Sequence, residues 1–243
     1  MFPALNTKKK ENSMLFRQLF DPVSSTYTYL LAERRGGEAL IIDPVLDRVD
    51  QYLQLIGELD LKLVLAVDTH IHADHVTAIG KLGEAAGCAT ALGEQSGAEC
   101  VSLRIGEGEI LKADSVTLKA VYTPGHTDDS YSFVMHDRVF TGDTLLIRGT
   151  GRTDFQNGDA GAQYDSLFNK LLKLPEETLV YPAHDYEGRT CSSIGEEKNH
   201  NPRLQVASRQ AYIEQMNALQ LDPPRMIHVA VPANRKCGVM AKR

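Results

Sequence analysis

Apolar and polar residues follow one another along the first part of the chain in short runs that are typical of β-strands. Three such runs, at residues 15–20, 26–33 and 38–43, are separated by turn-forming residues. Residues 46–60 then carry apolar side chains at helical spacing, and the continuous apolar run "LKLVLAV" at 61–67 fits a buried strand flanked by helices. The next segment, 75–87, predicts a helix that ends at Gly87.

The second half of the chain repeats this order of strands and a helix. Runs typical of strands occur at 107–111, 115–123, 130–136, 138–142 and 178–184, and helices are predicted at 162–174 and 202–221. We therefore expect an α/β chain in which two mixed sheets lie between helices, built as one domain over residues 14–243. Residues 1–13 have little hydrophobic periodicity and predict a disordered N-terminal extension.

The composition of the 243-residue chain narrows the class of protein. A hydrophobic fraction of 42% with 24% charged residues argues against disorder, and a formal net charge of -6 argues against a nucleic-acid partner, which needs a basic patch. No apolar segment has the length of a membrane span, and the N-terminus lacks the pattern of a secretory signal. The four cysteines are scattered without a CxxC pair, so we expect reduced thiols in a cytoplasmic protein.

Ligand-type residues follow the predicted strands. The segment "THIHADH" at 69–75 places three histidines and an aspartate directly after the apolar run 61–67. Three later strands end at His126 in "YTPGHT", Asp143 in "FTGDT" and His184 in "YPAHDY". Neutral imidazole and ionised carboxylate are the usual protein ligands of Zn²⁺ and Fe(II). Each motif alone is common by chance, but the four in this order, each after an apolar run, predict a metal site.

The motif order HxHxDH, TPGH, TGD and PAH resembles that of the metallo-β-lactamase superfamily. The resemblance spans residues 14–243 and implies an αββα sandwich with the metal at one edge of the sheets. The dinuclear hydrolases of this superfamily bind two metals through residues that here are His70, His72 and His126 for one, Asp74, His75 and His184 for the other, and Asp143 as the bridge. All seven positions are filled, so the sequence leaves both one and two metals open.

Further segments resemble the persulfide dioxygenases, the sulfur dioxygenase branch of this superfamily. They are "FDPVSSTYTYLLA", "IDPV", "TGDTLLIRGTGRTDFQ", "YPAHDY", "NPRL" and "VPAN" with "CGV". The related glyoxalase II branch usually has "GRFFEG" where this chain has "GRTDF", and it carries a longer helical C-terminal domain. The sequence is therefore more similar to the dioxygenases.

The dioxygenase resemblance implies a non-haem iron enzyme that oxidises glutathione persulfide with O2 to sulfite and glutathione, in sulfide detoxification. It implies one Fe(II) per chain, held by His70, His126 and Asp143, because two histidines and one carboxylate suit Fe(II) and leave metal positions free. The remaining ligand-type residues would orient these ligands and hydrogen-bond water or product: His72, Asp74, His75 and His184. A homodimer is the family-level expectation.

Two other classes of protein stay open. One is a hydroxyacylglutathione hydrolase, a glyoxalase II-like enzyme that would use two Zn²⁺ ions to cleave a thioester. The other is a metal-binding protein without catalysis, although a complete ligand set with open metal positions is hard to explain without chemistry.

Glutathione has two carboxylates at neutral pH, so its pocket should offer cations and hydrogen-bond donors. Arg152 is the first candidate because an arginine binds a carboxylate through two parallel hydrogen bonds. The alternative is a structural arginine that bonds a loop carbonyl or Asp154. Tyr186 and Thr127 are further candidates for substrate binding. The pair Asp128–Asp129 departs from the family pattern and is expected beside the substrate mouth.

Overall fold

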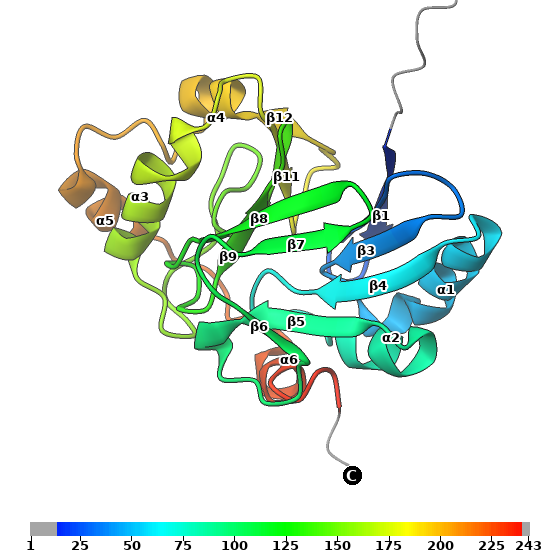
Figure 1. The fold of residues 1–243 in the computed structure, drawn as a ribbon. Helices are drawn as coiled ribbons and strands as arrows, with labels where there is room; N and C mark the ends of the chain where they lie inside the picture. The colour runs from blue at the N-terminus through cyan, green and yellow to red at the C-terminus, as the bar shows by residue number, and fades with distance from the viewer. Residues whose placement is uncertain (1–13, 240–243) are drawn as a thin grey trace, which may run out of the picture.

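A computed structural model describes residues 14–239, so the predicted extension at 1–13 lies outside the described residues. Two six-stranded sheets face each other, with helices on their outer faces (Figure 1). The first sheet runs in chain order through β1 (Leu15–Asp21), β2 (Thr26–Ala32), β3 (Glu38–Ile42), β4 (Lys62–Val67), β5 (Ala89–Gly93) and β6 (Leu103–Ile105). The second runs through β7 (Ile110–Ala113), β8 (Val116–Tyr122), β9 (Tyr131–Val134), β10 (Arg138–Gly142), β11 (Leu179–Pro182) and β12 (Ser192–Ser193).

Both sheets are mixed, as the sequence predicts. In the first sheet β1, β2 and β3 pair antiparallel, whereas β3, β4, β5 and β6 pair parallel. In the second sheet only β10 and β11 pair parallel. Because β9 is antiparallel to both β8 and β10, the strands β8, β10 and β11 all run in one direction, and their carboxyl ends lie at the same edge.

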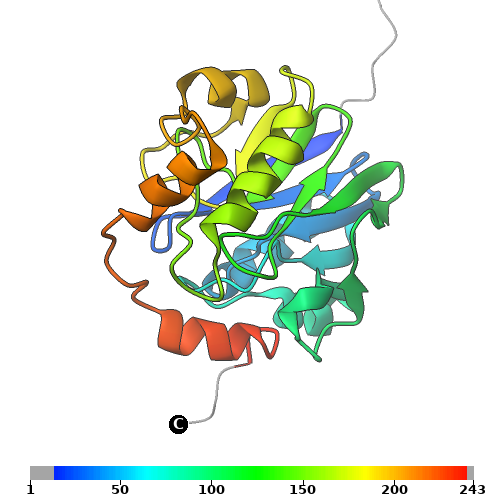
Figure 2. The ribbon, with the colours of Figure 1, turned by 90° about the vertical axis from the view of Figure 1, so that its left-hand side faces the viewer.

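Helices cover the outer face of each sheet (Figures 1 and 2). The first sheet is covered by the short helix η1 (Leu46–Arg48), α1 (Val49–Glu58) and α2 (Ile79–Ala86). The second is covered by α3 (Ala160–Asn169), η3 (Leu171–Lys173), α4 (Ile194–His200) and α5 (Arg209–Asn217). After α5 the chain returns to the first sheet, where α6 (Ile227–Asn234) packs beside the loop that contains η2 (Glu94–Ser96). Among the described residues, no helix is long and apolar enough to span a membrane.

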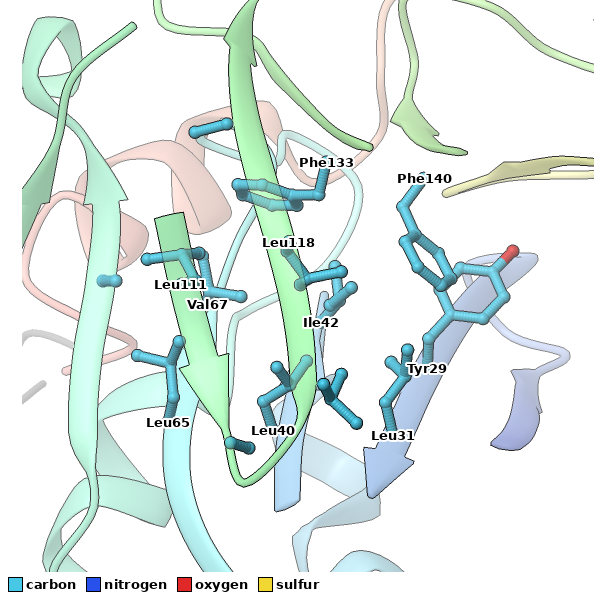
Figure 3. Packing of buried hydrophobic residues seen from close by; sticks show 14 of the residues in the cluster. Tyr29, Leu31, Leu40, Ile42, Leu65, Val67, Leu111, Leu118, Phe133 and Phe140 are labelled. Atoms are coloured by element: carbon cyan, nitrogen blue, oxygen red, sulfur yellow. The ribbon is translucent and has the colours of Figure 1, made fainter. Parts of the chain in front are cut away.

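The main core fills the space between the two sheets (Figure 3). Leu40, Ile42 and Val67 of the first sheet face Leu118 and Phe133 of the second. All five side chains are fully buried, so the hydrophobic effect contributes about 1.5–3 kcal/mol of stabilisation for each of them. This core fixes the separation of the sheets and therefore of the loops at their edge.

The C-terminal third departs from the sequence prediction in its helices. The predicted helix at 202–221 is wrong at both ends. The helix α5 begins only at Arg209, where the Ser208 hydroxyl accepts a hydrogen bond from Ala211 N–H, and it ends at Asn217. Residues 202–204 form a turn instead, in which Arg203 N–H donates to the Asn201 side chain at 3.0 Å. The helix α6 was not predicted because Pro232 lies inside it and its hydrophobic pattern is weak.

Two cysteines are joined, which corrects the prediction of four reduced thiols. Cys100, in the loop before β6, forms a disulfide with Cys237, just after α6, across a sequence separation of 137 residues. Their spacing gives no sign of the pairing, because only the return of α6 to the first sheet brings the two together. Cys88 and Cys191 are free thiols.

Candidate metal centre

The predicted ligands meet where the two sheets present the carboxyl ends of their strands. The loop of residues 69–77 after β4, here called the metal loop, carries His70, His72, Asp74 and His75. The loops after β8, β10 and β11 carry His126, Asp143 and His184. All seven sequence-predicted positions are brought together in two groups that share this edge.

The first group consists of His70, His126 and Asp143, whose ligand atoms lie within 4.8 Å of one another. His126 Nδ1 donates to the carbonyl of Arg152 at 2.7 Å, and its Nε2 lies 3.5 Å from Asp143 Oδ2. His70 Nδ1 is hydrogen-bonded to the Thr69 hydroxyl at 2.9 Å. One nitrogen of each ring is therefore fixed by the protein and the other is free to bind a cation, as in metal-binding histidines generally.

The second group consists of His72, Asp74, His75 and His184, again within 4.8 Å. His184 uses both ring nitrogens, since Nδ1 bonds Asp143 Oδ1 at 2.7 Å and Nε2 bonds Asp74 Oδ2 at 2.9 Å. By contrast, within residues 14–239 the buried atoms His72 Nδ1 and His75 Nε2 have no hydrogen-bond partner. Because an unpaired buried polar atom is costly, these two atoms fit a cation or water in this group.

The electrostatics of the site suit metal binding. Burial, together with the neighbouring imidazoles, holds the pKa of His70 and of His72 well below the usual range, so both imidazoles are neutral. Burial alone would raise the pKa of Asp143, but His184, His126 and His70 together outweigh burial and hold the pKa below its usual range. Burial opposes the charge of His184 as well, but Asp143 and Asp74 raise its pKa well above the usual value. Neutral imidazole and ionised carboxylate are the forms that bind metals.

Two glycines allow the ligand loops to approach one another. Gly142, directly before the candidate ligand Asp143, has φ +52, and a Cβ there would lie 2.7 Å from the Thr69 hydroxyl. A Cβ on Gly151 would lie 2.3 Å from the carbonyl of Asp143 and 2.7 Å from His126 Nδ1. Larger residues at either position would push the ligands apart.

Asp43 is a site residue that the sequence analysis missed. Its carboxylate accepts from Thr69 N–H at 2.7 Å and lies 3.1 Å from His72 Nε2, so it holds the metal loop and orients one ring. Burial raises its pKa to about 6. Its position directly after the apolar strand β3 is the same sequence signal that the candidate ligands show, although no histidine accompanies it in "IDPV".

The pair Asp128–Asp129 does not face the pocket beside the metal site. Asp129 is buried, and its carboxylate accepts from Ile71 N–H of the metal loop at 2.9 Å. Asp128 accepts from the Asn157 side chain at 2.8 Å. Asp129 therefore stabilises the metal loop, whereas Asp128 contacts the segment around Asn157.

A pocket of about 380 Å³ opens beside the first group. Its lining includes His126, Asp143, Arg152, Tyr186 and Leu221. Tyr186 is 72% exposed and its ring lies parallel to that of His184, with 6.1 Å between centroids. The pocket thus combines two candidate metal ligands with an aromatic side chain and a cation.

The side chain of Arg152 is already engaged. Its Nε and Nη2 donate to the two carboxylate oxygens of Asp154 at 2.6 and 2.7 Å, and further N–H groups donate to the carbonyls of Leu221 and Asp222. Thr127 is fully buried, with its hydroxyl 2.7 Å from that of Ser130. Of the three predicted substrate-binding residues, Arg152 and Tyr186 line the pocket and Thr127 is not among its lining residues.

Comparison with known proteins places this architecture in a family. Residues 21–99 and 101–184 match the family model described as "Metallo-beta-lactamase superfamily". The mouse protein "Persulfide dioxygenase ETHE1, mitochondrial" is 48% identical over 93% of this chain and 89% of its own length. The chain belongs to the persulfide dioxygenase family of the metallo-β-lactamase superfamily.

Solved structures agree with this membership. The crystal structure of ETHE1 from Myxococcus xanthus has a TM-score of 0.91 and 52% identity, and it covers 93% of this chain and 100% of that one. A more distant solved structure, TTHA1623 in a di-iron-bound form, has a TM-score of 0.62 and 27% identity over 77% of this chain and 98% of its own. The αββα sandwich expected from the sequence is therefore confirmed.

Proposed function

We propose that this persulfide dioxygenase family member is an Fe(II) enzyme that oxidises glutathione persulfide with O2 to sulfite and glutathione, in sulfide detoxification. The observation that carries the proposal is the separation of the ligands into two groups. His70, His126 and Asp143 direct ligand atoms toward one another, and His126 and Asp143 also line the pocket. His184 instead bonds carboxylates through both of its ring nitrogens. Two histidines and one carboxylate beside an open pocket suit a single non-haem Fe(II).

In this proposal the bound iron supplies the redox chemistry with O2 that no side chain provides. His70, His126 and Asp143 hold it, and the Arg152 carbonyl and Thr69 hydroxyl fix the two imidazole rings. His184 keeps Asp143 ionised and oriented, and it links that carboxylate to Asp74. Protons released or taken up beside the metal can pass between these two carboxylates through the His184 ring.

The substrate side of the proposal rests on the pocket. Tyr186 offers an exposed aromatic face and a hydroxyl at the mouth, and Arg152 offers the cation for a glutathione carboxylate. A carboxylate that binds Arg152 would share the guanidinium with Asp154. Thr127 remains a prediction from the sequence with no pocket contact to support it. A homodimer and a cytoplasmic location likewise remain predictions.

A dinuclear zinc thioester hydrolase is the second candidate. It is favoured by the second group, in which His72 Nδ1 and His75 Nε2 have no partner among the described residues, and by the two irons of TTHA1623. For His184 to bind a metal in this candidate, it must break its hydrogen bond to Asp143 or to Asp74.

Metal content and O2 uptake separate the two candidates. Protein purified without chelator should contain one iron per chain and should consume O2 on addition of glutathione persulfide, with sulfite formed in equal amount. It should leave a glutathione thioester unchanged. Two zinc ions per chain, with rapid thioester hydrolysis and no O2 uptake, would contradict the proposal and support the hydrolase.

A further inference from the structure

The segment "VPAN" near the C-terminus belongs to neither group of ligands, yet its asparagine reaches the metal loop. Asn234, the last residue of α6, is 1% exposed. Its Nδ2 donates to the carbonyls of His72 and His75, both at 2.9 Å, and its Oδ1 accepts from Thr77 N–H at 2.8 Å. One side chain thus satisfies three backbone groups within the loop that carries four of the seven ligand-type residues.

Only a primary amide meets these three requirements at once. Asparagine has two N–H donors and one carbonyl acceptor, so it can serve two carbonyls and one N–H. Aspartate has the same shape but no donor when ionised, so it would face the carbonyls of His72 and His75 without a hydrogen bond. The contacts bracket Asp74 and His75, and they fix the turn that directs both side chains into the second group.

The element that carries Asn234 is itself fastened to the first sheet. The disulfide Cys100–Cys237 closes just after α6, and Gly80 N–H of α2 donates to the Cys237 carbonyl at 3.2 Å. Gly238 has φ +85, and a Cβ there would lie 2.2 Å from the Thr77 carbonyl, so the backbone packs directly on the end of the metal loop. These contacts therefore hold the Asn234 side chain at a fixed position relative to the metal loop.

We propose that Asn234 is a positioning residue for the metal centre. It sets the conformation of the metal loop through the His72 and His75 carbonyls and the Thr77 amide, and it thereby aims the imidazoles and the Asp74 carboxylate. The inference rests on the proposed role of the metal loop in binding a metal, but not on that metal being iron.

The test uses the full-length chain loaded with Co²⁺, whose visible absorption reports the geometry of its ligands. Asn234→Ala removes all three hydrogen bonds, and Asn234→Asp removes the two donors while keeping the shape. Both variants should shift the Co²⁺ absorption bands and weaken Co²⁺ binding, measured by chelator competition, by about 10–100-fold, the usual effect of losing a group that orients a ligand.

Asn201→Ala is the matched control. Asn201 is also a fully buried asparagine, and its Nδ2 donates to the Gly149 carbonyl at 2.9 Å while its Oδ1 accepts from Arg203 N–H at 3.0 Å. This control should lower the melting temperature and leave the Co²⁺ bands unchanged. If the Asn234 variants behave in the same way, with a lower melting temperature but wild-type bands and affinity, Asn234 is merely structural and the proposal is overturned.

One measurement does not depend on the variants folding. In the wild-type chain without metal, the buried Thr77 N–H should exchange with solvent as slowly as the amides of β4, because it donates to Asn234. Rapid exchange at Thr77 would overturn the proposal. Failure of the wild-type chain to bind Co²⁺ at all would instead overturn the proposed metal function, and the role of Asn234 with it.

Discussion

At the scale of single residues, His70 and His72 stand two positions apart and serve different groups. His70 belongs with His126 and Asp143, whereas His72 faces Asp74, His75 and His184. We expect His70→Ala to abolish iron binding, because one of three ligands is lost. His72→Ala should cost about 10–100-fold in affinity. Iron content after dialysis against a weak chelator measures both. Equal loss in the two variants would indicate that both histidines are ligands.

Arg152 provides a second prediction at this scale. Arg152→Lys should keep the iron but lower kcat/KM for glutathione persulfide, because lysine cannot make the two-pronged contact. A hydrogen bond to a charged group contributes about 1.5–3 kcal/mol, which is roughly tenfold to a hundredfold in kcat/KM. Steady-state O2 uptake measures the effect, which should shrink for a persulfide without carboxylates. An equal loss of kcat/KM on both substrates would mean that Arg152 does not bind the substrate carboxylate. Its role would then be to hold Asp154, Leu221 and Asp222 together.

Asp129 makes the stability of the chain depend on pH. Burial raises the pKa of its carboxyl above the usual value, so the folded chain holds this proton more tightly than the unfolded chain. The stabilisation from this group is present below the unfolded pKa and is lost as the pH rises through the folded pKa. Asp129→Asn removes the titrating group, so this pH-dependent loss of stability should be absent in the variant. The melting temperature of the variant relative to wild type, both without metal, should therefore increase as the pH rises above about 4. A difference that does not change with pH would contradict this prediction.

At the scale of elements, the disulfide holds α6 against the first sheet. Cys100→Ser should lower the free energy of unfolding by about 2–4 kcal/mol, because the disulfide restricts the unfolded chain over a long loop. Denaturant unfolding measures this change. Cys191→Ser is the control, since Cys191 is a free and exposed thiol, and it should change stability by less than about 0.5 kcal/mol. Equal stability of the two variants would mean that packing alone holds α6.

The sequence predicts those elements whose pattern is local. The run at 61–67 forms β4, and the ligands follow their strands because a strand end with a histidine or aspartate is visible in the sequence. Asn234 and the cysteine pair could not be predicted, since their roles depend on the return of α6 over a long distance. Asp43 lies between these cases, since its place after β3 is visible in the sequence but its contacts with Thr69 and His72 are not.

At the scale of the whole molecule, the metal site joins the two sheets. His70 comes from the first sheet, whereas His126 and Asp143 come from the second, so a bound ion links the two halves of the sandwich. At a free metal concentration about 100 times the dissociation constant, the folded state should gain about 2.7 kcal/mol. Anaerobic unfolding with Fe(II) or with chelator measures this gain. His70→Ala should show almost none of it, and a full gain in that variant would contradict the site.

The disulfide also turns residues 100–237 into a closed covalent ring. His126, Asp143 and His184 lie inside this ring, and Cys100 joins it to the part of the chain that carries the metal loop. A protease that cuts after the exposed Arg225, between α5 and α6, would break the peptide chain between Asn234 and the metal loop. The two fragments would remain one molecule until the disulfide is reduced. A chain cut only after Arg225 can thus keep every group of its metal centre, and its two fragments should separate only on a reducing gel.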